Sequence, residues 1–171
     1  NLIYDSLMTQ SHDEPFSVYP LIAEAVSLAE DNSSITFFIN KNARFHDNHS
    51  ITAEDVQYTF NLLLAKGSPF YKAYYGDVAT VDIITPLSVK FTFKNLKNRE
   101  LPLILSQLPV LPKHFWEKDD NVFEAANLSI PLGSGPYQVS SVEAGKHINY
   151  ERVKNYWAAE LSVNKGRHNI D

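Results

Sequence analysis

Cysteine is absent from all 171 residues. Its absence excludes disulfide bonds, thiolate nucleophiles and thiolate zinc sites, and it is compatible with any cellular compartment. The sequence also has no run of about 18 apolar residues, so it predicts no membrane-embedded segment. Positive charge is scarce, because 15 Lys and Arg stand against 20 Asp and Glu and give a formal net charge of −5. This balance argues against a nucleic-acid partner, which would require the chain to neutralise phosphates.

The sequence has little material for nucleophilic catalysis. Gly133-Ser134-Gly135 is too short for a Gly-x-Ser-x-Gly nucleophile elbow, and Pro136 follows it directly. The same segment lacks the Lys-Ser/Thr of a P-loop and leads into a predicted strand. We therefore interpret it as a tight turn.

The composition is that of a globular protein, with 44% hydrophobic residues and a length that suits one domain with a sizeable core. Alternation of apolar and polar residues predicts strands, and helical spacing with Pro and Gly at the ends predicts helices. We expect a strand at 35–39, a helix at 53–66, a hairpin at 78–84 and 87–93, short helices at 103–108 and 112–116, a weak helix at 122–128, and a second hairpin at 137–142 and 147–152. We expect a buried turn at 21–25 and a loop at 9–19. Hairpins and helices come in runs without regular alternation, so the predicted class is mixed α+β.

The best-defined local structure lies between residues 44 and 56. Asp47-Asn48 predicts a turn, since Asn tolerates the left-handed backbone conformation. Thr52 is placed to cap a helix, and Glu54 and Asp55 would meet the exposed amides of its first turn.

This segment also resembles a known family, the family 5 extracellular solute-binding proteins, which are the dipeptide and oligopeptide receptors of bacterial ABC importers. Its first block of matching elements is Leu21-Ile22-Ala23-Glu24, the strand 34–39, Phe45-His46-Asp47-Asn48 and Ile51-Thr52-Ala53-Glu54-Asp55-Val56. Its second block is Gly133-Ser134-Gly135-Pro136-Tyr137, Val139, Glu151-Arg152 and Asn155-Tyr156-Trp157. The segments 109–116 and 163–167 are most similar to the oligopeptide and microcin C receptor branch. Asn48 stands where the family usually has Gly, a change that the turn accommodates.

The resemblance implies a fold and a function. Family members have two lobes that close on a peptide, and the closed form docks on an ABC permease. We therefore expect residues 1–171 to be a single domain, an excised portion of lobe I of a type II periplasmic-binding-protein fold, in the periplasm or another extracytoplasmic space. The ligand would be an oligopeptide or peptide conjugate, with nickel or haem open as alternative cargoes. The resemblance implies neither enzymatic activity nor a cofactor. Neither end looks like a natural terminus, because the chain begins without Met or a signal core.

Tyr71, Tyr74 and Tyr75 are candidate ligand-binding residues. A tyrosine ring buries apolar area while its hydroxyl stays available for hydrogen bonding, as a peptide pocket requires. The alternative is that these rings pack the junction between the helix and the following strand. By similarity to the family, the segment Ser106-Gln107-Leu108 also approaches the ligand.

His46, Asp47 and His49 form the alternative site, that of a small metal-assisted hydrolase to which Glu54 would contribute. Imidazole and carboxylate are good ligands for zinc or nickel. Two histidines three residues apart in a turn, however, lack the one-face spacing of the helical His-Glu-x-x-His motif. We favour a structural role, with His46 closing a turn and Asp47 accepting hydrogen bonds from backbone amides. Trp116 and Trp157 are interpreted as packing residues.

Overall fold

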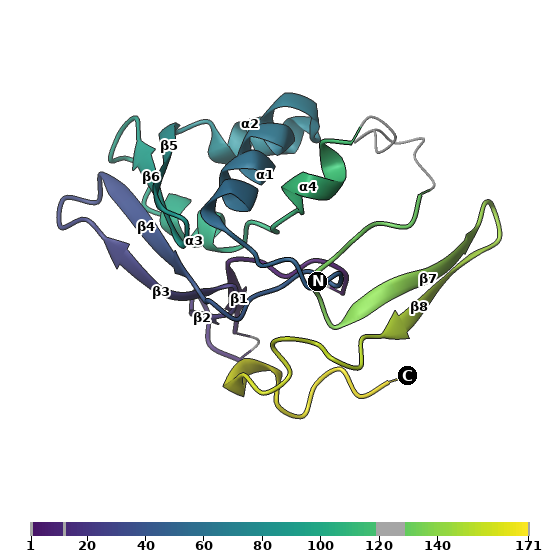
Figure 1. Ribbon diagram of the computed structural model, residues 1–171. Helices are drawn as coiled ribbons and strands as arrows, with labels where there is room; N and C mark the ends of the chain where they lie inside the picture. The colour runs from purple at the N-terminus through teal and green to yellow at the C-terminus, as the bar shows by residue number, and fades with distance from the viewer. Residues whose placement is uncertain (1, 12, 119–128, 171) are drawn as a thin grey trace.

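The computed structural model describes residues 2–11, 13–118 and 129–170. Its main sheet is antiparallel and has the strand order β3-β4-β6-β5 (Figure 1). The strands are β3 (Ala23–Leu28), β4 (Ser34–Ile39), β6 (Ser88–Phe93) and β5 (Val78–Thr85). Two separate hairpins pair β1 (Met8–Gln10) with β2 (Val18–Pro20), and β7 (Tyr137–Glu143) with β8 (His147–Arg152).

The helices are α1 (Ala53–Lys66), α2 (Pro69–Tyr75), α3 (Leu101–Ser106) and α4 (Lys113–Trp116), followed by a short 3-10 turn at Ser162–Asn164. Helix α1 lies against β5 and β6 and also contacts α2 and α4. No helix within the described ranges has both the length and the hydrophobicity needed to cross a bilayer.

The core lies between the main sheet and α1. Phe37 of β4 and Phe91 of β6 are fully buried and meet edge to face, with ring centroids 5.8 Å apart. Phe60 of α1 packs on Phe91 at 5.5 Å. Phe38 points to the opposite face of the sheet and is 41% exposed, as the alternation of a strand requires. This arrangement confirms the mixed α+β class.

The predicted start of α1 is confirmed. Thr52 has the extended backbone of an N-cap residue, and its N–H donates to Asp55 Oδ2 at 2.9 Å. The second carboxylate oxygen of Asp55 accepts from the backbone N–H of Lys113 at 3.0 Å, which ties α4 to the first turn of α1. Asn48 has a φ of 69°, as predicted for the preceding turn.

Two local predictions are wrong. Residues 21–25 do not form only a buried turn, because β3 begins at Ala23 and continues to Leu28. Most of β3 is exposed at the sheet edge, and the alternation that marks a half-buried strand is broken at Ala25-Val26, next to a shift in its register with β4. The predicted loop at 9–19 likewise contains parts of β1 and β2.

The remaining predicted elements are found with small shifts. Both hairpins and the short helix after Pro112 are confirmed. Helix α3 begins at Leu101 and ends at Ser106, two residues earlier than predicted, with Pro102 in its first turn. The predicted helix at 122–128 lies outside the described residues.

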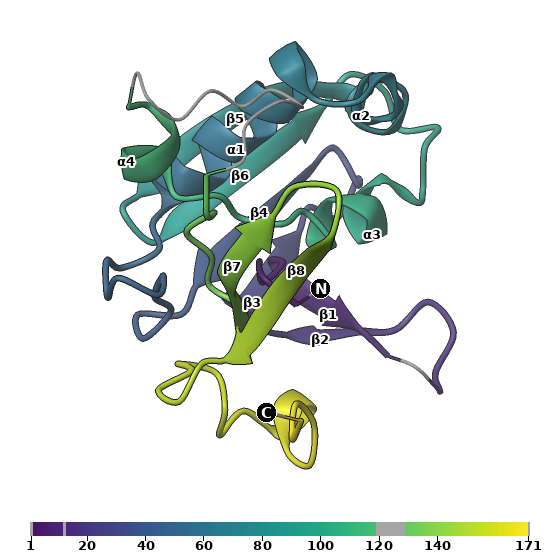
Figure 2. The ribbon, with the colours of Figure 1, turned by 90° about the vertical axis from the view of Figure 1, so that its right-hand side faces the viewer.

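The N-terminal segment, residues 2–7, connects the two halves of the molecule (Figures 1 and 2). On one side, the N–H of Leu7 donates to Leu108 O at 3.0 Å, and the carbonyl of Leu7 accepts from Ala23 N–H at 2.7 Å. On the other side, the carbonyl of Ile3 accepts from the N–H groups of Ser134 and Gly135, at 2.9 and 2.7 Å. The segment therefore lies between the main body and the chain that leads into β7.

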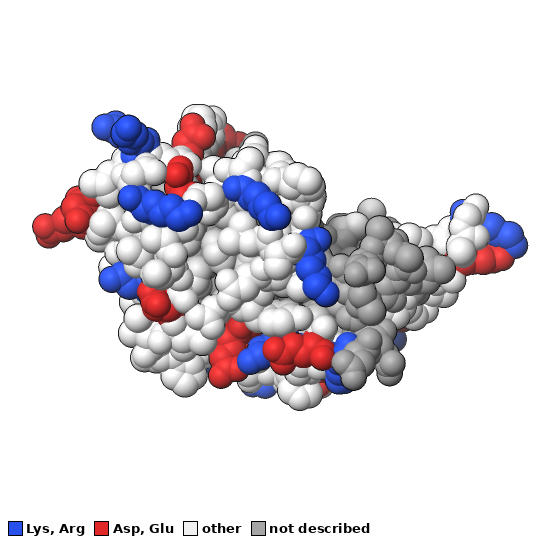
Figure 3. Space-filling view, turned by 90° about the horizontal axis from the view of Figure 1, so that it is seen from above, with Lys and Arg blue, Asp and Glu red and all other residues white. Residues whose placement is uncertain are grey.

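Charges of both signs are interspersed on the face seen from above Figure 1 (Figure 3). Among the described residues of this face, Lys and Arg do not gather into a broad basic area. A surface that binds nucleic acid needs such an area. This face therefore gives no support to a nucleic-acid partner.

Candidate functional site

A cavity of about 350 Å³ lies where the N-terminal segment, the end of α3 and the C-terminal residues meet. Its polar lining comes from segments far apart in the sequence and includes Gln10, Gln107, Asn164, Arg167 and His168. These side chains offer amide donors and acceptors beside a guanidinium group. The cavity can therefore bind a ligand rich in hydrogen-bonding groups.

A buried carboxylate stands at the wall of this cavity. Asp5 is 4% exposed, and the Tyr156 hydroxyl lies 3.0 Å from both of its carboxylate oxygens, which share the one hydrogen bond that this hydroxyl donates. Trp157 Nε1 donates to the same carboxylate at 3.0 Å. The backbone N–H of Asp5 donates to Ser134 Oγ at 3.0 Å, and Asn164 Nδ2 donates to the Tyr156 hydroxyl at 3.3 Å. This network connects the N-terminal segment to three segments that lie more than a hundred residues later.

The Asp5 network has unusual proton affinities. Burial raises the pKa of Asp5 to about 7, although the hydrogen bonds from Tyr156 and Trp157 act to lower it. Burial and the nearby Asp5 carboxylate raise the pKa of Tyr156, so its hydroxyl remains a donor at neutral pH. The Tyr156 hydroxyl and the Trp157 indole N–H are thus positioned to donate hydrogen bonds to the Asp5 carboxyl group.

The glycines at 133 and 135 allow the chain before β7 to approach the N-terminal segment closely. A Cβ on Gly133 would lie 2.2 Å from Ile3 O, and one on Gly135 would lie 2.4 Å from Leu2 O. The approach is fixed by His46, whose Nε2 donates to Gly135 O at 2.8 Å while its backbone N–H donates to Gly133 O at 2.8 Å. His46 therefore holds a distant turn rather than closing its own. Burial lowers the pKa of His46, which keeps the ring neutral.

The depressed pKa of His46 predicts sensitivity to acid. The folded state resists protonation of this ring, whereas the unfolded state takes up a proton near the ordinary imidazole pKa of about 6.5. The contribution of His46 to the free energy of unfolding is therefore complete above this pH and decreases as the pH falls below it. We expect His46→Gln to lose less stability than the wild type between about pH 6.5 and pH 5. Urea unfolding of both proteins across this range measures the difference. Parallel curves for the two proteins would contradict the assignment.

The three candidate tyrosines lie on α2 and do not line the cavity beside Asp5. Tyr75 is buried and packs on Phe60 with a centroid distance of 5.4 Å, which fits the packing alternative. Tyr71 is partly buried, and Tyr74 is 43% exposed beside Phe70. A ligand-binding role for these rings stays a prediction.

The candidate segment at the end of α3 has one residue in the cavity. Gln107 is exposed and lines it. Ser106 is buried and its hydroxyl donates to Leu103 O at 2.6 Å, while Leu108 is fully buried in the core. For Ser106 and Leu108 a direct role in binding also stays a prediction.

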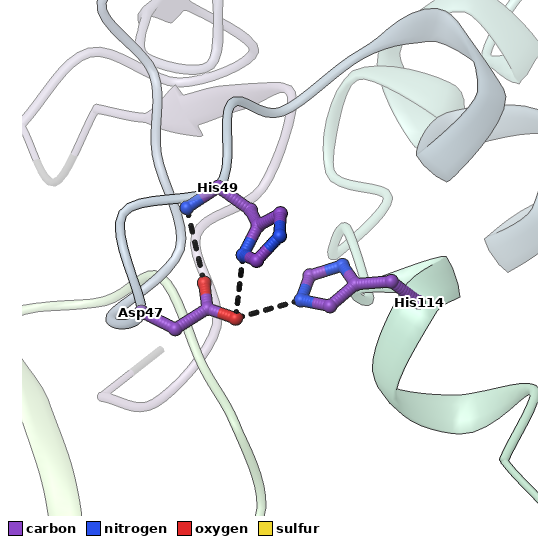
Figure 4. A group of neighbouring side chains, drawn as sticks. All are labelled: Asp47, His49 and His114. Atoms are coloured by element: carbon purple, nitrogen blue, oxygen red, sulfur yellow. Dashed lines mark hydrogen bonds and ion pairs between the residues drawn. The ribbon is translucent and has the colours of Figure 1, made fainter.

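Only Asp47 and His49 of the predicted metal cluster lie together in the structure, and His114 joins them. Asp47 Oδ2 accepts from His49 Nδ1 at 2.9 Å and from His114 Nε2 at 2.7 Å (Figure 4). The other oxygen of Asp47 accepts from the His49 backbone N–H at 3.1 Å, as the structural interpretation predicted. His46 is directed to Gly135 instead, and Glu54 pairs with Lys113 Nζ at 3.1 Å.

Comparison with known proteins decides the family. Residues 17–171 match the bacterial extracellular solute-binding proteins, family 5 middle. The chain belongs to this family. It is 44% identical over 169 residues to the uncharacterized protein YejA of Escherichia coli, and 42% identical over 172 residues to the peptidoglycan-binding protein YepA of Agrobacterium fabrum. The matches cover 99% and 100% of this chain but only 27% and 28% of those relatives.

The likeness extends to the fold of solved structures. The chain superposes on the mannohexaose-bound oligopeptide ABC transporter, periplasmic oligopeptide-binding protein, of Thermotoga maritima with a TM-score of 0.76 and 25% identity. The match covers 94% of this chain and 29% of that one. The predicted resemblance and the predicted fragment of a periplasmic-binding-protein fold are both confirmed. YepA and the Thermotoga maritima protein are both named as binding proteins.

The structure of this family 5 chain explains why its two motif blocks occur together. Phe45-His46-Asp47-Asn48 and Gly133-Ser134-Gly135 meet through the hydrogen bonds of His46. Asn155-Tyr156-Trp157 reaches back to Asp5. The blocks are therefore the two sides of one junction around the N-terminal segment.

Sequence reasoning missed several residues of the site, among them Asp5 and His168. One signal pointed to Asp5, because it is a lone acidic residue between the apolar residues 2–4 and Leu7. For His114, no local pattern could have revealed its contact with Asp47, which lies 67 residues earlier.

Proposed function

We propose that this chain is a single domain within lobe I of a longer substrate-binding protein, which captures oligopeptides or peptide conjugates and delivers them to an ABC permease. Family membership and the names of its relatives support this function. The protein would act in the periplasm of a Gram-negative cell or in an equivalent extracytoplasmic space. It would bind its ligand and release it unchanged, with no enzymatic step and no nucleic-acid partner.

The observation that carries the proposal is the cavity beside Asp5 within a chain of this family. Gln10 and Gln107 present amide groups of the kind that pair with a peptide main chain, and Arg167 offers a charge partner for a carboxylate. Peptide main chains are the same for every sequence, so such groups accept many ligands. We propose Gln107 as a ligand-binding residue of this cavity. Tyr71, Tyr74, Tyr75, Ser106 and Leu108 stay proposed ligand-binding residues that do not line it.

Two of the comparisons favour conjugates that contain sugar as well as peptide. A relative with 42% identity is named for peptidoglycan, which is a polymer of sugar and peptide. The Thermotoga maritima protein is titled oligopeptide-binding and holds mannohexaose. We therefore include glycosylated peptides in the proposed ligand class.

Isothermal titration calorimetry tests the proposal directly. The longer protein is titrated with a tetrapeptide, with a peptidoglycan-derived muropeptide and with mannohexaose. We expect saturable binding of the tetrapeptide or the muropeptide, because closure of two lobes on the ligand supplies most of the contacts. Titration of the 171-residue chain alone should give negligible heat. Low-micromolar peptide binding by the isolated chain, or exclusive binding of mannohexaose by the longer protein, would overturn the proposal.

Substitution of Gln107 tests the position of the site. We expect Gln107→Ala in the longer protein to weaken peptide binding by about fivefold to tenfold, the loss typical of one hydrogen bond. Gln138→Ala is the matched control, since Gln138 lies on β7 and does not line the cavity. Equal affinities for the two variants would place the ligand elsewhere.

A further inference from the structure

The Asp47, His49 and His114 cluster lies apart from the cavity beside Asp5 and is unexplained by peptide binding. Its three side chains come from two segments, the turn after β4 and helix α4, and converge on one carboxylate oxygen (Figure 4). The two imidazole rings stack on each other with centroids 4.2 Å apart. One ligand atom from each residue lies within 4.8 Å of the others.

The geometry points to a binding site for a divalent transition-metal ion, with Asp47, His49 and His114 as its protein ligands. Two imidazoles and one carboxylate are the donor set that suits Zn²⁺ and Ni²⁺, and three protein ligands leave at least one position for water. This site is independent of the proposed peptide site and goes beyond the proposed function.

The three ligands are accessible to an ion from solvent. Side-chain exposure is 64% for His49, 32% for Asp47 and 31% for His114. A hydrated cation can therefore reach all three side chains.

The hydrogen bonds in the cluster do not block the site. Both bonds place a proton on the imidazole nitrogen that faces Asp47, at His49 Nδ1 and at His114 Nε2. A neutral imidazole moves this proton to its other nitrogen by changing tautomer, which leaves the inner nitrogen free to bind the metal. Asp47 Oδ2 lies 2.9 and 2.7 Å from the two imidazole nitrogens, and two ligands at about 2.0–2.1 Å from a tetrahedral ion lie about 3.3 Å apart, so the oxygen needs to move away from each nitrogen by only about half an ångström.

Metal binding at this site joins two distant parts of the chain. Asp47 and His49 belong to the turn before α1, whereas His114 belongs to α4. An ion that binds only when these segments are together stabilises the folded state as its concentration rises. Metal binding at this site is therefore expected to raise the melting temperature, which can be measured besides the affinity.

The test is calorimetric titration of the purified protein, without a polyhistidine tag, with ZnCl₂. We expect one Zn²⁺ per chain with a micromolar dissociation constant and a melting temperature that rises with Zn²⁺ concentration. His49→Gln should weaken binding by about tenfold or more, since removing a ligand costs at least as much as removing its hydrogen-bond partner. Because His49 is the most exposed of the three, this variant should keep the fold.

His147→Gln is the matched control. His147 also lies near a carboxylate, with Nδ1 3.6 Å from Glu143 Oε2, and it does not belong to the three-ligand cluster. We expect His147→Gln to bind Zn²⁺ as the wild type does. Absence of saturable binding in the wild type, or equal losses in His49→Gln and His147→Gln, would overturn the assignment. Peptide binding by the longer protein is measured separately, so either proposal can fail alone.

Discussion

Gly135→Ala is expected to lower the free energy of unfolding by about 3 kcal/mol, a loss typical of overpacking combined with broken hydrogen bonds. The new methyl group would lie 2.4 Å from Leu2 O and 2.9 Å from both the carbonyl carbon and the carbonyl oxygen of Ile3. These are backbone atoms, so a change of side-chain rotamer cannot relieve the contact. The N-terminal segment would have to move away, and the Gly135 N–H to Ile3 O bond of 2.7 Å would weaken. Equilibrium unfolding in urea measures the loss.

Gly145→Ala is the control for this substitution. Gly145 lies between β7 and β8 with a φ of 75°, and among the described residues no heavy atom beyond its two chain neighbours lies within 4 Å of a Cβ placed there. Replacing Gly145 with Ala should lower the free energy of unfolding by about 1 kcal/mol, since only backbone strain opposes the substitution. If Gly135→Ala and Gly145→Ala lowered the free energy of unfolding equally, close packing against the N-terminal segment would not explain why residue 135 is a glycine.

The second large effect concerns the pH dependence that Asp5 imposes on stability. Its pKa is raised by burial to about 7 in the folded state, against 3.8 for an ordinary Asp. Between these values the folded state binds more protons than the unfolded state, so the free energy of unfolding decreases as the pH rises. At about 1.4 kcal/mol per pKa unit, the decrease from Asp5 reaches about 4 kcal/mol between pH 4 and pH 8.

Asp5→Asn isolates this contribution, because an amide of the same shape cannot ionise. We expect the wild type to lose stability relative to Asp5→Asn as the pH rises from 4 to 8, as measured by urea unfolding at each pH. Asp31→Asn provides a contrast of opposite sign. Hydrogen bonds from Ser33 lower the pKa of the exposed Asp31, so the wild type should lose stability relative to that variant as the pH falls below the ordinary Asp value of 3.8. A constant difference between the wild type and Asp5→Asn would show that Asp5 stays ionised in the folded state.

The elements that the sequence predicted well are those whose causes are local. Thr52 and Asp55 define the start of α1 by their own hydrogen bond, and Asn48 accounts for the turn by its own conformation. Residues 85–88 supply the turn that pairs β5 with β6. Strand β3 was missed because its position at the edge leaves nearly all its side chains exposed, and alternation then has no physical cause.

The candidate site was harder to predict because its parts come together only in the folded chain. Asp5 and Tyr156 are separated by 151 positions, and Asp47 and His114 by 67. Nothing in the residues near His114 indicates its partner. The family motifs did identify Tyr156 and Trp157 as notable, but not that they donate to a buried carboxylate. Gln107, by contrast, was identified through resemblance and does line the cavity.

The central place of residues 2–7 bears on how the protein is made. Translation proceeds toward the C-terminus, so this segment leaves the ribosome before the later residues that hold it. Ser134 and Tyr156, which hold Asp5, are 129 and 151 positions further along. At about 5–20 residues per second, residues 2–7 wait about 6 to 30 seconds for them. During that time the carbonyl of Ile3 and the side chain of Asp5 lack the hydrogen bonds that these later segments supply.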